Sequence, residues 1–109
     1  MTLDEYQHQA LRTAAHVRPD RDGWAMASMG LAGEAGEVVD ELKKHLFHGH
    51  AYRRDALIRE LGDVLWYAAV LAHLAGASLD EVATANVLKL RERYPAGFSH
   101  ERSKDRGLT

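Results

Sequence analysis

The sequence contains no cysteine, only two prolines, a single isoleucine and no long apolar run. Without cysteine it can form no disulfide bond, no thiolate metal site and no cysteine nucleophile. Its 14 basic residues against 16 acidic ones lack the basic excess that general nucleic-acid or membrane-surface binders carry. The longest nearly uninterrupted apolar run, residues 64–72, is too short to span a bilayer. The N-terminus is polar and acidic, unlike a signal peptide. These absences predict a soluble cytoplasmic protein whose partners include neither nucleic acid nor membrane.

The scarcity of β-branched residues favours an all-α fold. Alanine and leucine, both strong helix formers, dominate the composition, and no segment alternates as a strand would. A chain of 109 residues suits one domain, which we expect over residues 1–96, followed by a charged, partly ordered tail over residues 97–109. Apolar spacing, capping residues and helix breakers predict four helices, arranged like a four-helix bundle: Thr2 to about Val17, Trp24 to about Phe47, Arg54 to Ala75, and Ser78 to just before Pro95.

Two features of the second and third predicted helices indicate close packing. Gly30, Gly33 and Gly36 each cost a helix roughly 1 kcal/mol relative to alanine, so either the helix begins later or a neighbour approaches that backbone closely. Over residues 64–74 the third helix is apolar almost all round. Three neighbouring helices would struggle to cover it, so the sequence predicts an obligate oligomer, a homodimer or a dimer of dimers.

Acidic residues recur at helical spacing beside the apolar stripes of the same two helices. Glu34 and Glu37 are three apart, Glu41 follows four later, and Glu60 and Asp63 are again three apart. Residues three or four apart project from the same sector of a helix. If the two helices pack antiparallel by their apolar stripes, the acidic pairs can face each other across a groove.

A groove of converging carboxylates needs a cation, shared protons or strong screening, because like charges repel. Oxygen ligands without cysteine or histidine suit hard ions, here Mg²⁺ or Mn²⁺. The same spacing is consistent with solvated salt bridges, for which Lys43, Lys44, Arg54 and Arg59 could supply the opposite charges. The acids border the apolar stripe instead of opposing it, and this position favours the groove.

The segments GLAGEAGEV at residues 30–38 and ELGDVLWY at residues 60–67 carry the pattern E-x-x-E, a spacer and E-x-x-D. With this pattern the chain resembles the MazG-like nucleoside triphosphate pyrophosphohydrolases. That family belongs to an all-α superfamily that also contains dimeric dUTPases and phosphoribosyl-ATP pyrophosphohydrolase. NVLKLRERYP at residues 86–95 is similar to the closing helix of the family, so the resemblance covers about residues 3–98.

The resemblance implies hydrolysis of a nucleoside triphosphate between its α and β phosphates, giving the monophosphate and pyrophosphate and so cleansing the nucleotide pool. It also implies that Glu34, Glu37, Glu60 and Asp63 hold Mg²⁺, with Mn²⁺ as a substitute. One carboxylate outside the tightest coordination can accept the proton of the attacking water. Glu37 and Glu41 are the candidates, and the sequence leaves the choice open.

Further residues are candidates for substrate contacts. Asn86, Lys89 and Arg93 share one face of the fourth helix and could reach the phosphates. Trp24 and Tyr67 could form walls for the base, because aromatic rings stack on any nucleobase with little selectivity. The preferred base and sugar therefore stay open.

Two other functions remain as alternatives. One is phosphoribosyl-ATP pyrophosphohydrolase activity, within the same superfamily. The other is a helical interaction module that kept the bundle and lost catalysis. The presence of all four signature carboxylates argues against that loss.

Overall fold

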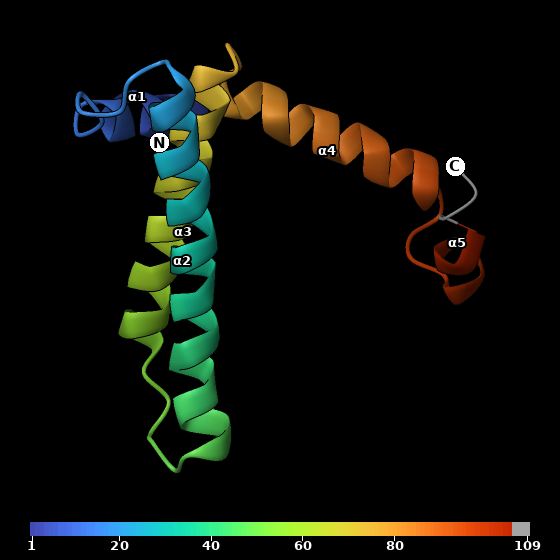
Figure 1. Ribbon diagram of the computed structural model, residues 1–109. Helices are drawn as coiled ribbons and strands as arrows, with labels where there is room; N and C mark the ends of the chain where they lie inside the picture. The colour runs from blue at the N-terminus through green and yellow to red at the C-terminus, as the bar shows by residue number, and fades with distance from the viewer. Residues whose placement is uncertain (106–109) are drawn as a thin grey trace.

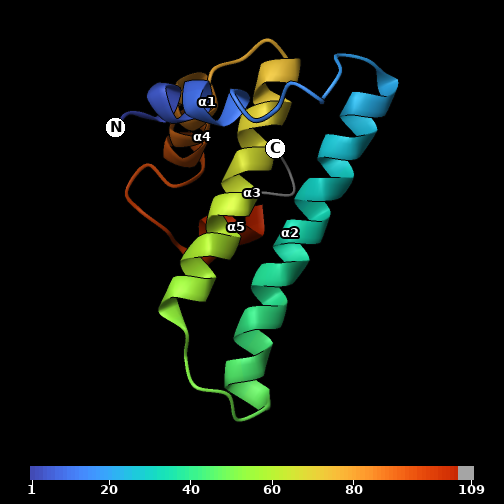
Figure 2. The same ribbon diagram turned by 90° about the vertical axis from the view of Figure 1, so that its left-hand side faces the viewer.

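The computed structural model of the protein describes residues 1–105, which form helices without any β-sheet. The helices are α1 (Leu3–Leu11), α2 (Arg21–Phe47), α3 (Arg54–Leu74), α4 (Leu79–Arg93) and α5 (His100–Asp105). The long helices α2 and α3 form an antiparallel hairpin, α1 lies across the end of the hairpin where α3 finishes, and α4 leaves from that same end (Figures 1 and 2). The all-α class predicted from the sequence is confirmed.

No single helix in the described part of the chain is long and apolar enough to cross a membrane. The helices α3 and α4 meet that criterion only as a pair, and the chain bends by 98° between them.

Three helix ends lie where the sequence predicts them, because each is set by a local hydrogen bond or turn. Thr2 Oγ1 accepts from the Glu5 amide at 3.1 Å, and Ser78 Oγ accepts from the Glu81 amide at 3.1 Å. Gly76, at φ 77°, ends the turn after α3 in the left-handed conformation that favours glycine. The sequence therefore determined these boundaries directly.

Two predicted boundaries were wrong. Helix α1 ends at Leu11, well before Val17, because Thr13 Oγ1 donates to the Ala10 carbonyl at 2.7 Å and the chain continues in tight turns. Helix α2 begins at Arg21 and not at Trp24, because Asp20 caps it by accepting from the backbone N–H at position 23 at 3.0 Å. Residues 21–23, in the polar segment before Trp24, therefore form the first turn of α2.

The core lies where α1 and the loop after it cover the hairpin. Ala27, Ala69 and Val70 are almost fully buried there. Trp66 packs against this core and donates its indole N–H to the Ala10 carbonyl at 3.2 Å. The apolar stretch 64–74 is therefore covered in large part by α1 and α2 of the same chain, although Leu65 stays 38% exposed; the oligomer expected from this stretch stays a prediction.

Gln7 joins three elements at the covered end. Its side-chain amide donates to the carbonyls of Ala69 and Ala77, at 3.1 and 3.2 Å, and its side-chain oxygen accepts from the Leu79 amide at 3.1 Å. Gln7 is 6% exposed, so each of its polar atoms finds a partner away from water. The amide thereby ties α1 to the end of α3 and the start of α4.

Helix α4 projects away from the hairpin, and the segment after it folds back on its far end (Figure 1). The sequence predicted no helix there, yet α5 forms. Arg102 donates to the carbonyls of Glu92 and Arg93, at 3.0 and 2.9 Å, and so caps the end of α4. The four long segments therefore do not close into a bundle within the described part of one chain.

Candidate functional site

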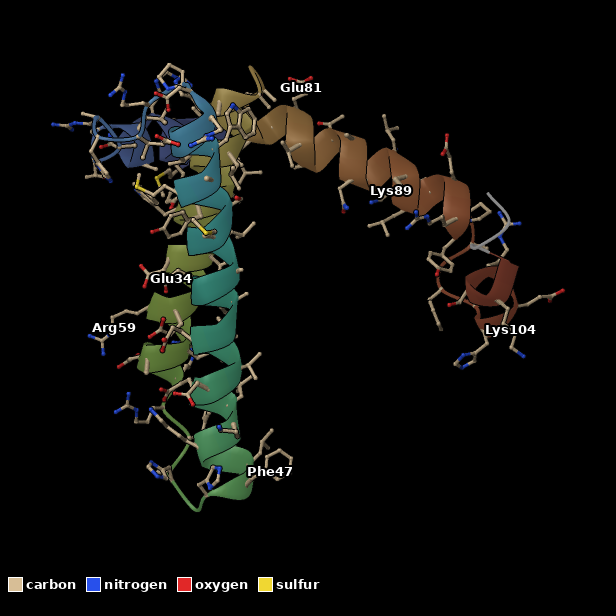
Figure 3. All side chains as sticks on the ribbon, viewed as in Figure 1. Glu34, Phe47, Arg59, Glu81, Lys89 and Lys104 are labelled. Carbon is tan, nitrogen blue, oxygen red and sulfur yellow. The ribbon has the colours of Figure 1, made fainter. Side chains whose placement is uncertain are left out.

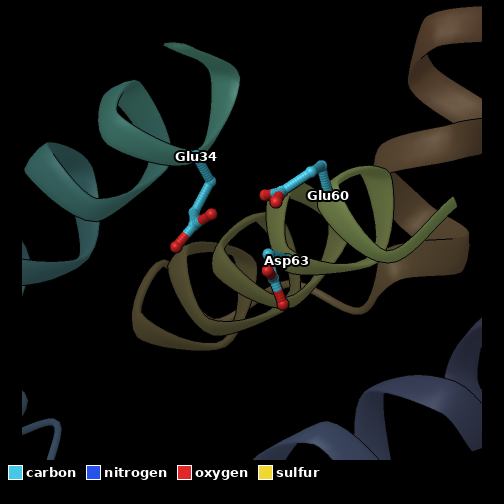
Figure 4. A group of neighbouring side chains, drawn as sticks. All are labelled: Glu34, Glu60 and Asp63. Carbon is cyan, nitrogen blue, oxygen red and sulfur yellow. The ribbon is translucent and has the colours of Figure 1, made fainter. Parts of the chain in front are cut away.

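Three carboxylates from the two helices of the hairpin meet in its middle. Glu34 extends from α2, and Glu60 and Asp63 extend from α3 toward the same space (Figure 4). Each offers one oxygen, and these oxygens all lie within 4.8 Å of one another. The antiparallel pairing of α2 and α3 (Figure 2) brings Glu34 of the first acidic pair to Glu60 and Asp63 of the second, in the manner that the sequence predicted.

The charge of this group is not balanced by basic side chains. Among the described residues, no ion pair involves any of the four signature acids. The neighbouring acids are all paired: Asp40 with Lys43 and Lys44, at 3.7 and 3.3 Å, and Glu41 with Arg53. Lys43 and Lys44, which the sequence analysis considered as counter-charges for the convergent acids, therefore form ion pairs with Asp40 instead.

The surroundings of Glu34 change its pKa. Desolvation at the groove raises the pKa of Glu34 above its ordinary value, and the negative charges of Asp63, Glu60 and Glu37 raise it further. A cation placed among the oxygens would reverse this effect. The donor set is oxygen only, so the group fits a hard divalent cation.

Glu37 and Glu41 stand in different surroundings. Glu37 is exposed on α2, close enough for its charge to act on Glu34, but it lies outside the group of three. Glu41 has its side chain 13% exposed and accepts from Arg53 twice, at 3.0 and 3.5 Å. The carboxylate of Glu41 is therefore held by an arginine, whereas that of Glu37 is free of ion pairs among the described residues.

Tyr67 lies beside the carboxylates, one helical turn beyond Asp63. A Cβ at Gly30 would overlap the Tyr67 ring, so only glycine admits the ring at this place. Glycine at position 30 thus shows the close approach that the sequence predicted. Gly33 and Gly36 do not, because a Cβ at either would meet nothing within 4 Å. For these two, the expected close neighbour is not supplied by the described residues of the same chain and stays a prediction.

Tyr6 is a site neighbour that the sequence did not single out. Burial raises the pKa of its phenol, and the charge of Asp63 raises it further, so α1 brings this ring close to one end of the acidic group. In the sequence, Tyr6 belongs to none of the acidic or basic motifs that single out the other candidate residues. No local signal distinguishes it, because its position depends on how α1 crosses α3.

The remaining predicted contacts are not gathered at the carboxylates within one chain. Trp24 is 42% exposed in the first turn of α2, and ten residues at 1.5 Å place it about 15 Å along the helix from Glu34. Figure 3 shows Lys89 on α4, far from Glu34 on the hairpin. Asn86 and Arg93 share that helix with Lys89. These three side chains therefore cannot touch a substrate held by the acids of their own chain in this arrangement.

Comparison with known proteins places this geometry in a family. The model of the MazG nucleotide pyrophosphohydrolase domain matches residues 26–98, which include all four signature acids. The chain is 37% identical over 105 residues to the Gene 37 protein of Mycobacterium phage L5, covering 89% of this chain and 92% of that protein. No solved structure matches the chain significantly. With the acid pattern, the all-helical fold and this match in agreement, the chain belongs to the MazG nucleotide pyrophosphohydrolase family.

Proposed function

We propose that the protein is a Mg²⁺-dependent nucleoside triphosphate pyrophosphohydrolase, which converts NTP or dNTP and water into the monophosphate and pyrophosphate. The observation that carries this proposal is the group formed by Glu34, Glu60 and Asp63, three convergent carboxylates without a basic partner among the described residues. Carboxylates with a purely structural role would form ion pairs with basic side chains, as Asp40 and Glu41 of α2 do. The cytoplasmic nucleotide pool is the proposed place of action.

The three carboxylates, with Glu37 beside them, would hold the cation. A divalent cation supplies polarisation of the phosphoryl oxygens and neutralises the triphosphate, which the acidic groove would otherwise repel. Mn²⁺ prefers the same oxygen ligands and should substitute for Mg²⁺.

Glu37 is the proposed general base. In the reaction, the oxygen of water bonds to the α-phosphorus, the bond from that phosphorus to the bridging oxygen breaks, and pyrophosphate leaves. The proton of the water goes to a carboxylate, and Glu37 is exposed next to the group of three. Both carboxylate oxygens of Glu41 already accept hydrogen bonds from Arg53, so they are engaged elsewhere.

Tyr67 is the proposed contact for the base or sugar, because its ring is anchored against Gly30 next to the acids. Trp24 would require a substrate extending about 15 Å along α2, so it is the weaker candidate.

The test is a product analysis with a panel of NTPs and dNTPs in Mg²⁺, in Mn²⁺ and in EDTA. We expect monophosphate and pyrophosphate, no diphosphate intermediate, and no turnover in EDTA. In ¹⁸O-labelled water the label should enter the monophosphate. Label in pyrophosphate would show attack at the β-phosphorus and would contradict the mechanism. The same panel should include phosphoribosyl-ATP.

Matched variants locate the site. Glu60→Gln should lower turnover by about 100-fold or more, the scale seen when one electrostatic stabiliser of a transition state is lost. Asp40→Asn is the control, since it neutralises an acid of the same hairpin that is paired with lysines outside the group. Equal activity of the Glu60 variant and the control would refute the site, and inactivity of the wild type toward every nucleotide would favour an interaction module.

A further inference from the structure

An open cavity of about 380 Å³ lies at the start of α3, and arginines dominate its lining. The residues that line it are Tyr52, Arg53, Arg54, Asp55, Ala56 and Arg59. We call it the arginine cavity. Its three guanidinium groups stand against the single carboxylate of Asp55, so the lining is positively charged, whereas the whole chain carries a net charge of -2.

The three arginines of the cavity differ in what they bind within the chain. Arg53 donates to Glu41 at 3.0 and 3.5 Å, and this contact across the hairpin fixes one wall. Arg54 and Arg59 are exposed and make no ion pair among the residues that the structure describes, although Asp55 lines the same cavity. Two guanidinium groups of the cavity are therefore available to a ligand, and neither is the counter-charge that the sequence analysis considered for the acids.

Available guanidinium groups around a cavity suit a phosphate-type anion. The planar fork of arginine binds two phosphate oxygens at once, with charge-assisted hydrogen bonds. Arg54 and Arg59 are five residues, or about 7.5 Å, apart along α3, so together they suit two linked phosphate groups better than one. The first turn of α3 lines the same cavity, and no side chain caps its backbone N–H groups.

The arginine cavity adjoins the acidic group along α3. Glu60 directly follows Arg59, and Arg54 lies six residues, or about 9 Å along the helix, before Glu60. Figure 3 shows Arg59 and Glu34 on the same side of the hairpin. An elongated anion with one end at the carboxylates can therefore extend to the arginines along this side.

We propose that the arginine cavity binds the diphosphate end of the nucleoside triphosphate, with Arg54 and Arg59 on its β and γ phosphates. The identity of the ligand rests on the proposed function, whereas the anion site itself does not. When the bond to the α-phosphorus breaks, its electron pair stays with the pyrophosphate, and the two guanidinium groups stabilise the negative charge that develops there. Cleavage leaves pyrophosphate at the arginines and the monophosphate at the acids.

Binding of inorganic pyrophosphate to metal-free protein tests the anion site without any activity. In ¹H–¹⁵N NMR spectra, pyrophosphate should shift the side-chain Nε–H signals of Arg54 and Arg59. Arg59→Gln should keep the helical circular dichroism and weaken pyrophosphate binding about tenfold or more, because a charge-assisted contact is lost. Arg12→Gln is the matched control, since it removes an exposed arginine of α1 that does not line the cavity. Equal affinity of the two variants, or no binding to the wild type, would overturn the site.

Product inhibition tests the assignment to the diphosphate end of the substrate. During nucleotide hydrolysis in Mg²⁺, Arg54→Gln and Arg59→Gln should each raise the inhibition constant of pyrophosphate about tenfold and leave that of the monophosphate nearly unchanged. A general distortion of the groove would change both constants together. Arg12→Gln should change neither. Equal changes for the two products, or unchanged inhibition by pyrophosphate, would contradict the assignment.

The anion site and the proposed function can fail separately. If the wild type hydrolyses no nucleotide, the proposed function fails, while the NMR titration still decides whether the arginine cavity binds pyrophosphate. If the wild type hydrolyses nucleotides but the arginine signals do not move, the function stands and this inference is overturned. A non-hydrolysable triphosphate analogue with Mg²⁺ should displace pyrophosphate from the arginines. Pyrophosphate that stays bound would show a separate site for the free anion and would overturn the link to the triphosphate.

Discussion

The α2–α3 hairpin has an end that α1 covers and a middle that carries the acids, and the two differ in how their side chains are packed and paired. At the end covered by α1, Ala27, Ala69 and Val70 are buried and every buried side-chain polar atom of the described residues has a hydrogen-bond partner. In the middle, Glu34, Glu60 and Asp63 gather like charges without a basic partner among the described residues. The comparison shows that buried contacts are concentrated at the covered end, whereas the middle holds like charges that repel one another and lower stability.

The largest expected effect tests the covered end. Ala69→Asp should prevent folding or lower the free energy of unfolding by more than about 4 kcal/mol, because Ala69 is 0% exposed and the new carboxylate would be buried without a partner. Circular dichroism during thermal unfolding would measure this. Ala85→Asp, on the exposed surface of α4, is the matched control and should change stability little. Similar stability of the two variants would show that the core lies elsewhere.

A smaller loss is expected at the polar junction of the covered end. Gln7→Leu should lower the free energy of unfolding by about 2–4 kcal/mol, because the Leu79 amide and two carbonyls lose their partner where water is excluded. Urea unfolding provides the measurement, with the exposed Gln9→Leu as control. An equal, slight change in both variants would contradict the structural role of Gln7.

The boundary between the two parts can be tested with a pair of glycines. Gly30→Ala should be destabilising by about 1–2 kcal/mol, since its Cβ would clash with the Tyr67 ring. Gly33→Ala should be stabilising by about 1 kcal/mol, because the site is open and alanine favours the helix. Thermal unfolding of both variants measures whether each substitution raises or lowers the Tm. The same sign for both would mean that Tyr67 does not pack against α2.

The smallest effect concerns the acidic middle of the hairpin and depends on pH. The pKa of Glu34 is raised above its ordinary value of 4.5, so the folded state holds this proton more tightly than the unfolded state. Stability should therefore fall as pH rises from about 4.5 through the raised pKa, and stay lower above it. Glu34→Gln removes this loss, so in EDTA the variant should have the higher Tm at pH 7 and no advantage at pH 4.

The same Tm comparison can be repeated at pH 7 after Mg²⁺ or Mn²⁺ is added. A cation that binds the folded state raises the Tm of the wild type. The gain should shrink in Glu34→Gln and persist in Asp40→Asn, whose acid is paired with lysines. Parallel Tm profiles of the wild type and the Glu34 variant, with and without metal, would show that the convergent carboxylates are ordinary surface charges.

Much of the candidate site could be predicted from spacing. Glu34, Glu60 and Asp63 were expected to meet, and they do, because an antiparallel pairing follows from the apolar stripes and fixes which sector of each helix faces the groove. The state of Glu41 was not predictable, because its partner Arg53 lies twelve positions away, beyond the turn of the hairpin. The position of Tyr6 near Asp63 was not predictable either, since it depends on where α1 crosses α3.

The sequence by itself determined the helical class, the caps at Thr2 and Ser78, and the acid pattern that identifies the family. These depend on bonds and periods within about one helical turn, which a linear chain displays directly. Only the tertiary structure decided that α1 covers the apolar stretch of α3 and that α4 points away from the acids of its own chain. It also decided that Lys43 and Lys44 form ion pairs with Asp40 and not with the convergent carboxylates. These depend on contacts between distant segments, where burial and the competition of several partners for one charge select the outcome.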